Sequence, residues 1–461
     1  MKIRASTILI ALSSLYLITS MYGIEQYAVV FAFMRLFRLA CLPLFLFFIA
    51  FLLPKQPSRK FKSFLPMILP IVALLTVNTI QVTALPPGLA ATHTSFSVRF
   101  TALFLLYIAT LLAINNLSAN KLINTLLVIL IAIFFVGIAH YPQIIARSGA
   151  SIGAALSNYG QIASRYQLSG FFGSSNEDAN GMMTIFPLVL LWIERRKGLW
   201  KNILRVSIFA IFAIVLLFNG TRTALVISMP FITFLFYSDM SLKKAMQMAL
   251  LGLVAGAIAA FLGGDLIGRV FGDEADGGGT LGWRIEHAWL PAIHYTLAHS
   301  PLFGFGSRGW EYICYQLEIF TPWVDGFLPA PAPAHSGYVW TLASWGFLGL
   351  AAYVSFIAAL AFEAFKLSQV RDYEISLPGK ALFCSMMGYC LWALVSNVMM
   401  SQGWIILFCL AMLIAAYKFI YLSEYQTLAY EESFANPEEI AAPIYPSSAH
   451  APYWIEDARY R

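Results

Sequence analysis

The chain has few charged side chains for its length. Only 11% of its 461 residues are Asp, Glu, Lys or Arg, whereas a soluble globular protein has roughly 25%. Hydrophobic residues make up 59% of the sequence. This composition excludes an ordinary soluble domain and predicts a membrane protein with several spans. The net charge of +6 does not indicate affinity for nucleic acid, because the lysines serve membrane topology.

Cysteine is also scarce, which excludes a disulfide framework. Five cysteines are present, and only Cys314 lies in a long segment between apolar stretches, so it has no partner there for a disulfide. The sequence also lacks an internal repeat. No small-residue cleavage site follows the first apolar run, so residues 5–22 are interpreted as an uncleaved span rather than a signal peptide.

About twelve apolar stretches have the ~20-residue length of a membrane-spanning helix. The sequence therefore predicts an all-α polytopic membrane protein with one large outer loop that contains amphipathic helices. The predicted spans cover residues 5–22, 34–53, 64–81, 98–114, 121–140, 180–193, 202–218, 223–238, 244–262, 336–362, 381–399 and 403–421.

The spans divide the chain into four parts. An N-terminal transmembrane bundle is expected over residues 1–262, a large periplasmic loop over 263–335 and C-terminal transmembrane helices over 336–422. The tail over 423–461 has few apolar runs and many acidic residues and prolines. It is therefore predicted to be a disordered cytoplasmic appendage.

Lysine is absent from every second connection between the predicted spans. The connections that contain it are predicted to be cytoplasmic, because basic residues are retained on that side of the membrane. Both termini then lie inside, and the large loop lies outside. The basic residues of these inner connections are Lys55, Arg59, Lys60, Lys62, Lys121, Arg195, Arg196, Lys197, Lys201, Lys243, Lys244, Lys366, Arg371 and Lys380.

Arginine is the basic residue of the opposite, outer side. Its planar guanidinium binds phosphate through paired hydrogen bonds, whereas lysine acts as a mobile point charge. An outer face with arginine and no lysine therefore predicts a site for a phosphate or diphosphate headgroup, although any single arginine there could be an ordinary surface charge. The outer arginines are Arg147, Arg165, Arg222, Arg269, Arg284 and Arg308.

An amphipathic helix is predicted over residues 281–299 of the large loop, lying on the outer leaflet. Its expected apolar face consists of Ile285, Trp289, Ala292 and Ile293, and its polar face of Arg284, His287 and His294. Pro329, Pro331 and Pro333 then lead stiffly to His335, at the start of the next span. The position of His335 is therefore expected to be well fixed.

Six short motifs occur in order between about residues 165 and 350. Together they resemble the O-antigen ligase and O-antigen polymerase superfamily of bacterial inner-membrane glycosyltransferases. The family usually has Asn after the loop histidine, where this chain has Ser336. The motifs cover residues 170–180, 219–223, 283–284, 299–306, 334–338 and 345–349.

This resemblance implies transfer of a glycan from undecaprenyl diphosphate to an acceptor hydroxyl, on the outer face of the bacterial inner membrane. The acceptor is a growing glycan in polymerases, lipid A core in ligases and a protein hydroxyl in related transferases. The alternatives stay open, and a polymerase is favoured here. Expected partners are the lipid-linked glycan, the acceptor, membrane lipids and other polysaccharide-assembly proteins. No metal, nucleotide or other cofactor is implied.

The chemistry of such a transfer assigns roles to five residues. A departing lipid diphosphate gains negative charge, which arginine forks stabilise. Arg222 and Arg284 are the first candidates because each is expected at a helix start, and Arg165 and Arg308 are further candidates. His335 suits the acceptor side, where a neutral imidazole with a pKa near 6.5 would take the hydroxyl proton in a direct displacement. The alternatives are topology or capping roles for the arginines and a helix cap for His335.

Other conspicuous residues have simpler interpretations. His287, His294 and His299 are expected to be surface or packing histidines, and no role is expected for His93 or His140. The aromatic residues of the loop either stack on sugar rings or belong to the interfacial aromatic belt. These aromatics are Trp310, Tyr312, Tyr315 and Trp323. The sequence contains no metal-ligand spacing on the outer side.

A polysaccharide-precursor transporter or flippase is the alternative function. Twelve spans with both ends inside also match a transporter layout. Transporters place ionisable residues within their spans, whereas the spans predicted here are almost free of charge. The chain also lacks two equivalent halves.

Overall fold

The computed structural model describes residues 28–52, 58–85, 87–114, 116–148, 175–195, 198–219, 284–320, 331–396, 398 and 403–435. These residues are helical apart from short connections, and none of them forms a β-strand. A single isolated bridge joins Phe320 and Pro331. The predicted all-α class is therefore confirmed for this part of the chain.

Nine of the predicted spans coincide with described helices. The other three, 5–22, 223–238 and 244–262, lie outside the described residues. The nine helices are α2 (Ala28–Leu52), α3 (Ser58–Ala84), α4 (Pro87–Ala113), α5 (Asn116–Ser148), α7 (Ser175–Glu194), α8 (Leu199–Asn219), α15 (Gly337–Ser368), α16 (Tyr373–Val395) and α17 (Gly403–Ala435).

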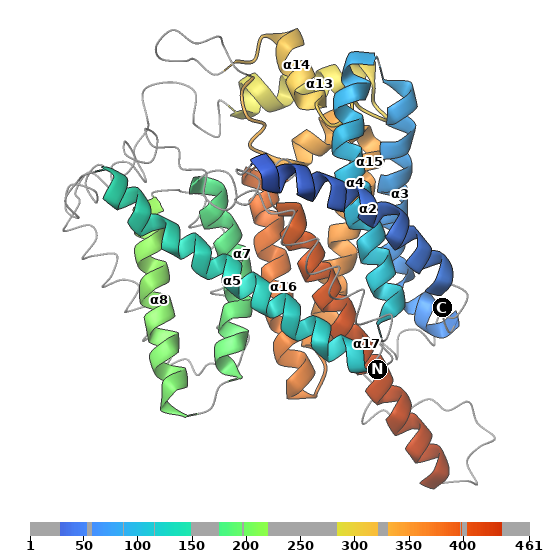
Figure 1. The fold of residues 1–461 in the computed structure, drawn as a ribbon, viewed down its shortest axis with the longest axis vertical. Helices are drawn as coiled ribbons and strands as arrows, with labels where there is room; N and C mark the ends of the chain where they lie inside the picture. The colour runs from blue at the N-terminus through green and yellow to red at the C-terminus, as the bar shows by residue number, and fades with distance from the viewer. Residues whose placement is uncertain are drawn as a thin grey trace.

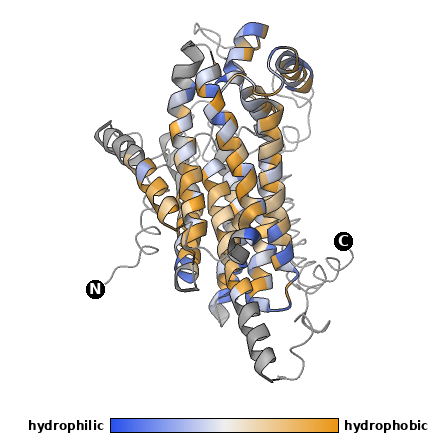
Figure 2. Ribbon diagram, turned by 90° about the vertical axis from the view of Figure 1, so that its right-hand side faces the viewer, coloured by the Kyte–Doolittle hydropathy of each residue, from blue (hydrophilic) through white to orange (hydrophobic). Residues whose placement is uncertain are grey.

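Several of these helices are long and apolar enough to cross a membrane. Within the described residues, five segments meet this criterion: Lys62–Thr83, Phe96–Ala113, Ala119–Val136, Gly337–Ser368 and Gly403–Ser423. The middle of the bundle is hydrophobic and its two ends are more polar (Figure 2). A band of this kind is expected where helices face lipid, so the chain is a multi-pass membrane protein.

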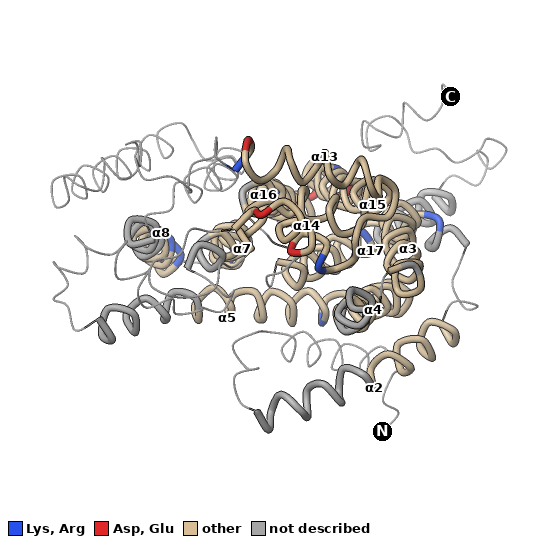
Figure 3. The backbone as a smooth tube through the Cα atoms, turned by 90° about the horizontal axis from the view of Figure 1, so that it is seen from above, with Lys and Arg blue, Asp and Glu red and all other residues tan. Residues whose placement is uncertain are grey.

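Three shorter helices form a lobe at one end of the bundle (Figure 1). They are η3 (Arg284–Trp289), α13 (Leu290–His299) and α14 (Gly309–Leu317). The lobe, defined as residues 284–320 and 331–335, lies over α15, α16 and α17 when the molecule is seen from above (Figure 3). It belongs to the segment predicted as the large outer loop.

The lysine-bearing ends of the helices lie at the end of the bundle opposite the lobe. There α3, α5, α8 and α16 begin, and α7 and α15 end (Figure 1). The lysines on these helix ends include Lys62, Lys121, Lys201 and Lys366. This arrangement agrees with the alternation of lysine along the chain, while the side of the membrane on which each end lies stays a prediction.

Helix α17 occupies the centre of the bundle. Every residue from 403 to 418 is buried, as expected for a helix that is apolar on all faces. It packs against α4, α5, α15 and α16. The helix continues to Ala435, so the predicted boundary between span and tail at residue 422 falls inside a continuous helix.

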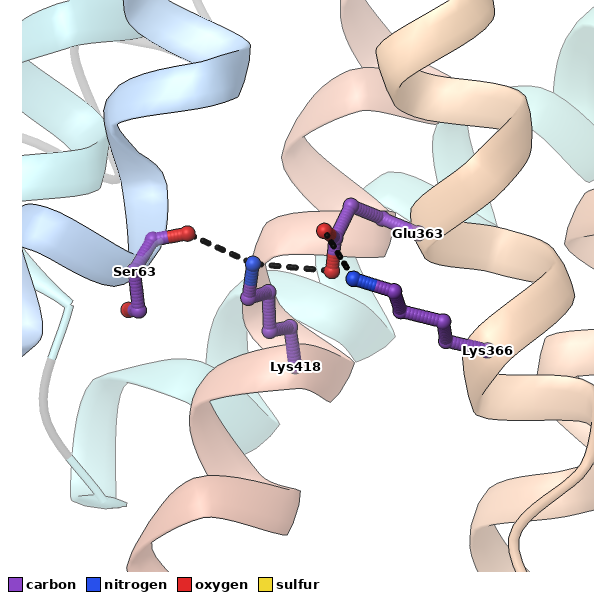
Figure 4. Close-up of polar contacts among 4 residues, drawn as sticks. All are labelled: Ser63, Glu363, Lys366 and Lys418. Carbon is purple, nitrogen blue, oxygen red and sulfur yellow. Dashed lines mark hydrogen bonds and ion pairs between the residues drawn. The ribbon is translucent and has the colours of Figure 1, made fainter. Parts of the chain in front are cut away.

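A buried ion pair joins three helices near the lysine-bearing end (Figure 4). Nζ of Lys418 in α17 lies 2.8 Å from a carboxylate oxygen of Glu363 in α15 and donates to the carbonyl of Ser63 in α3 at 2.6 Å. Lys366 approaches the other carboxylate oxygen at 3.3 Å. The spans are therefore less free of charge than expected, because Lys418 lies inside a predicted span, where Glu363 pairs with it.

Candidate functional site

His335 stands in an unusual backbone conformation directly before α15. Its φ is +48°, in the left-handed region. Few residues other than glycine adopt this region, although histidine does so more often than most. Such a conformation costs of order 1–3 kcal/mol and persists only where the surroundings hold it in place. The site therefore fixes His335 in a position that the isolated chain would avoid.

Ser336, not His335, caps α15. The backbone of Ser336 is extended, and its hydroxyl accepts a hydrogen bond from the N–H of Val339 at 3.4 Å. The alternative interpretation of His335 as the cap is therefore wrong. Asn and Ser are both strong N-cap residues, so the departure from the family pattern at position 336 preserves the same local function.

Two tryptophans, the partly buried Trp289 and the buried Trp310, hold the segment that leads to His335. The indole N–H of Trp289 donates to the carbonyl of Ala334 at 2.6 Å, and that of Trp310 donates to the carbonyl of Ala332 at 2.6 Å. The N–H of Ala332 donates to Ile319 at 3.1 Å. The expected fixed approach to His335 is thus observed, with hydrogen bonds adding to the stiffness of the prolines.

Trp310 is only 2% exposed. It can therefore neither stack on a sugar nor lie in an interfacial belt, and both interpretations of this residue are wrong. Trp323 lies outside the described residues.

Arg284 is close enough to His335 for its charge to act on the histidine. Arg284 is the first residue of η3 and is partly buried. Its Nε is buried and has no hydrogen-bond partner among the described residues. Buried polar groups are nearly always hydrogen-bonded, so this guanidinium is one to which an acceptor group can bind. Burial lowers its pKa, but a guanidinium remains charged in proteins.

The pKa of His335 is lowered to about 4, first by burial and then by the positive charge of Arg284. The expectation of an ordinary pKa near 6.5 is therefore wrong for this state of the protein. The imidazole is neutral throughout the physiological range. An anion bound to Arg284 would offset the charge of the guanidinium and raise the pKa of His335 again.

The polar and apolar faces of the lobe helix differ from those predicted. The residues that pack inward are Ala288, Ala292 and Thr296, whereas Ile285 is 37% exposed. The segment from 284 to 289 is a π-helix, whose wider turn shifts the register relative to an α-helix. This shift separates the partly buried Arg284 from the exposed His287 and His294. A helical wheel with 3.6 residues per turn cannot anticipate it.

The remaining predicted arginines are not brought to this pair in the described part of the chain. Arg308 is exposed at the start of α14, where its charge acts on the carboxyl of Glu311. Burial has the larger effect there and raises the pKa of Glu311. Arg165 and Arg222 lie outside the described residues. The assignments of these three arginines stay predictions.

Two of the sequence motifs form one backbone junction, the glycine junction, which consists of residues 301–306 and 343–348. Helix α15 is interrupted at Gly346, with φ +64° and ψ −164°, a conformation open essentially to glycine alone. The interruption leaves backbone N–H and C=O groups of α15 without partners inside the helix, and residues 301–306 form hydrogen bonds with them. Its hydrogen bonds are Phe305 N to Ala343 O at 2.9 Å, Gly306 N to Ser344 O at 2.8 Å, Phe347 N to Pro301 O at 2.8 Å and Leu348 N to Leu302 O at 3.2 Å.

The two backbones of the junction approach too closely for side chains. A Cβ on Gly304 would lie 2.6 Å from the backbone nitrogen of Gly346, and a Cβ on Gly346 would collide with Leu302. Gln81 of α3 donates to the carbonyls of Phe303 and Ser344. The junction thus attaches the lobe to α15 and α3 and fixes its position beside His335.

His93 supports this junction and was missed as a contributor. Its ring is fully buried, and Nδ1 accepts the N–H of Ser307 at 3.0 Å. Nε2 lies 2.9 Å from the carbonyl of Asn78 and 3.0 Å from the hydroxyl of Ser97. Because Nδ1 is an acceptor, Nε2 carries the proton. The only sequence signal was a histidine close to an apolar span, which does not identify its partners.

The exposed histidines of the lobe agree with their predicted surface positions. His287, His294 and His299 are all exposed. Within the described residues, no group of three or more His, Cys, Asp or Glu side chains could hold a metal ion. Cys314 is fully buried, and burial raises the pKa of its thiol to about 12. It is therefore unreactive toward thiol reagents.

The described helices and this site define a multi-pass membrane protein with a histidine–arginine pair in a lobe at one end of its bundle. Residues 207–354 match the family model described as O-Antigen ligase. The match covers about a third of the chain, includes the pair and the glycine junction, and confirms the resemblance to the O-antigen ligase and polymerase superfamily. No curated protein matches the chain.

Proposed function

We propose that the protein transfers a glycan from undecaprenyl diphosphate to an acceptor hydroxyl at the outer face of the bacterial inner membrane. The observation that carries this proposal is a partly buried arginine, whose Nε has no partner within the described part of the chain, acting on a neutral histidine held in a left-handed conformation. A diphosphate and an attacking hydroxyl need these two kinds of group side by side. The family match supports the same chemistry.

Arg284 binds the diphosphate in this proposal. As the bond to the anomeric carbon breaks, its electron pair passes to the bridging oxygen of the departing lipid diphosphate. A guanidinium already in place stabilises the developing charge without reorganisation. Arg222, Arg165 and Arg308 are further candidates for the same phosphates, with Arg222 the first among them because it is expected at a helix start.

His335 accepts the proton of the acceptor hydroxyl as the oxygen attacks the anomeric carbon, with inversion. A base with a pKa of about 4 is weak. It becomes stronger once the diphosphate neutralises Arg284, so the full base strength exists only when the donor is bound. This coupling disfavours activation of a hydroxyl in the absence of a donor.

The distribution of lysine supports a site on the periplasmic side in this proposal. Helix ends rich in lysine are retained in the cytoplasm, and the lobe lies at the other end (Figure 1). Both termini are then cytoplasmic. The acceptor is a growing glycan if the protein is a polymerase, which we favour, or lipid A core if it is a ligase.

The test is transfer by the purified protein in liposomes, with lipid-linked glycan extracted from the source cells as donor. His335→Asn is the informative variant, because Asn tolerates the left-handed backbone but is not a base at any physiological pH. We expect a loss of 10²–10⁴-fold in kcat with donor binding retained. Near-normal transfer by this variant would refute His335 as the base, and normal transfer by both His335→Asn and Arg284→Ala would refute the proposed site.

A further inference from the structure

Four aromatic side chains of the lobe form a connected row that has no part in the reaction proposed above. The aromatic row consists of His299, Tyr295, Phe305 and Tyr312. The ring centroids are 4.2 Å apart for His299 and Tyr295, 5.7 Å for Tyr295 and Phe305, and 5.2 Å for Phe305 and Tyr312.

The row is anchored on both sides. The backbone N–H of Phe305 donates to Ala343 at 2.9 Å as part of the glycine junction. Nδ1 of His299 lies 2.9 Å from the carbonyl of Tyr295, one turn earlier in α13. The rings are thus fixed in place before any ligand arrives, which lowers the entropic cost of binding one.

The row lies at the border between the core and the surface, since Tyr295, Phe305 and Tyr312 also pack against the core. His299 is exposed and the other three side chains are partly exposed. Tyr315 extends the aromatic surface along α14, where it is 59% exposed and packs edge-on against Phe320 at 5.6 Å. Aromatic rings present flat apolar faces, and the tyrosine hydroxyls and imidazole add hydrogen-bonding groups. Sugar rings match this combination, because they have apolar C–H faces bordered by hydroxyl groups.

The row is some distance from the reacting pair. Tyr295 follows Arg284 by eleven residues along the continuous η3–α13 helix, so the two are separated by roughly 15 Å. A sugar at the row cannot be the one whose bond is made or broken at His335. A glycan that extends from the pair would reach the row after several sugar units.

We propose that the aromatic row is a remote glycan subsite, which binds the glycan chain several sugars away from the reacting bond. This inference rests on the proposed function and names the part of the substrate recognised far from the chemistry. Binding at such a distance contributes equally to the ground state and the transition state. It therefore lowers KM and leaves kcat unchanged.

The test compares glycans of graded length, released by partial hydrolysis from the source cell's own surface glycan and used as acceptors. Tyr295→Ala and Tyr312→Ala are expected to raise KM for long glycans by about 2- to 10-fold each, the range of one aromatic contact. KM for the shortest glycans and kcat should not change. Tyr295→Phe keeps the aromatic ring, so its KM for long glycans should stay close to that of the wild type. The matched control is Tyr373→Ala, because Tyr373 is 56% exposed at the opposite end of the bundle.

Donor and acceptor are distinguished by varying each concentration in turn, since the glycan at the row could belong to either. Direct binding of the released glycans is measured by equilibrium dialysis without donor lipid, with the His335→Asn variant in parallel. Weaker glycan binding by Tyr295→Ala supports the subsite, whatever the rate of glycan transfer by His335→Asn. The binding result can therefore refute the subsite without refuting the proposed function, and the transfer result can do the reverse. An unchanged KM and unchanged binding at every length, or an equal fall in kcat for all lengths, would overturn the subsite.

Discussion

The charge of Arg284 lowers the pKa of His335 and should therefore determine the pH below which the rate of glycan transfer falls. Burial and Arg284 together lower the pKa of His335 from 6.5 to about 4, and burial is the larger cause. Arg284 therefore accounts for the smaller part of this shift. Removing the charge in Arg284→Gln should raise the free-enzyme pKa of His335, but not back to its ordinary value.

The assay is kcat/KM for glycan transfer as a function of pH, which reports the pKa values of the free enzyme, together with kcat, which reports those of the bound complex. Wild-type kcat/KM should stay level as the pH falls to about 5 and drop only near pH 4. The kcat limb should lie at higher pH, because the bound diphosphate offsets Arg284.

The control is Arg284→Lys, which keeps the positive charge but loses the paired hydrogen bonds. Both variants should lose activity, about 10²-fold or more if the contact is made mainly in the transition state, yet only the glutamine variant should move the acid limb of kcat/KM. Identical limbs for Arg284→Gln and Arg284→Lys would refute the electrostatic coupling between the two residues.

Four further outcomes are expected. First, protonation of His335 is unfavourable in the folded protein, so thermal stability in detergent should fall as the pH drops from about 6.5 toward 4, by at most ~3 kcal/mol, and His335→Asn should lack that part of the loss. Second, Gly346→Ala should prevent formation of the glycine junction and greatly reduce the yield of folded protein, whereas alanine at Gly198, where no atom lies within 4 Å of the added Cβ, should cost only the strain of a positive φ. Third, Glu363→Ala should destabilise the bundle by about 3–5 kcal/mol by removing the carboxylate that faces the buried Lys418, and the double variant Glu363→Gln/Lys418→Met should recover much of this loss in thermal unfolding. Fourth, a cysteine at Tyr315, which is 59% exposed, should react with an impermeant thiol reagent from the periplasmic side, and labelling from the cytoplasmic side alone would reverse the topology.

The sequence was sufficient for the helical class and for most of the span positions. Apolar runs of the right length predicted the helices because a bilayer requires them. The observed helix boundaries differ from the predicted ones where a capping residue starts the helix earlier. Helix α16 begins at Tyr373 rather than near 381, because the carboxylate of Asp372 accepts the N–H of Glu374 at 2.9 Å. Apolarity alone does not show where a polar first turn begins.

The types of the candidate site residues were readable from the sequence. Arg284 and His335 indicated phosphate and proton chemistry, and in the structure the charge of Arg284 acts on His335, while their roles stay predictions. Their electrostatic coupling was not predictable, because burial and distance appear only in three dimensions. Trp289 and Trp310 could not be assigned from sequence either, since an indole that clamps a backbone carbonyl is indistinguishable from one at a membrane interface. The π-helical turn has no sequence pattern that would separate it from an α-helix.

Helix α15 extends from one end of the helical bundle to the other. It begins two residues after His335 and carries Glu363, twenty-eight residues beyond that histidine, a separation of at most about 42 Å because the helix is interrupted at Gly346. This is close to the full thickness of a bilayer with its headgroups, about 40–45 Å. Glu363 is paired with Lys418 near one end of the bundle. The position of His335 relative to the opposite membrane surface therefore depends on the thickness of the bilayer. A thicker bilayer would draw the histidine below the plane of the lipid diphosphate, and a thinner one would lift it above that plane, so membrane thickness should tune the rate of transfer.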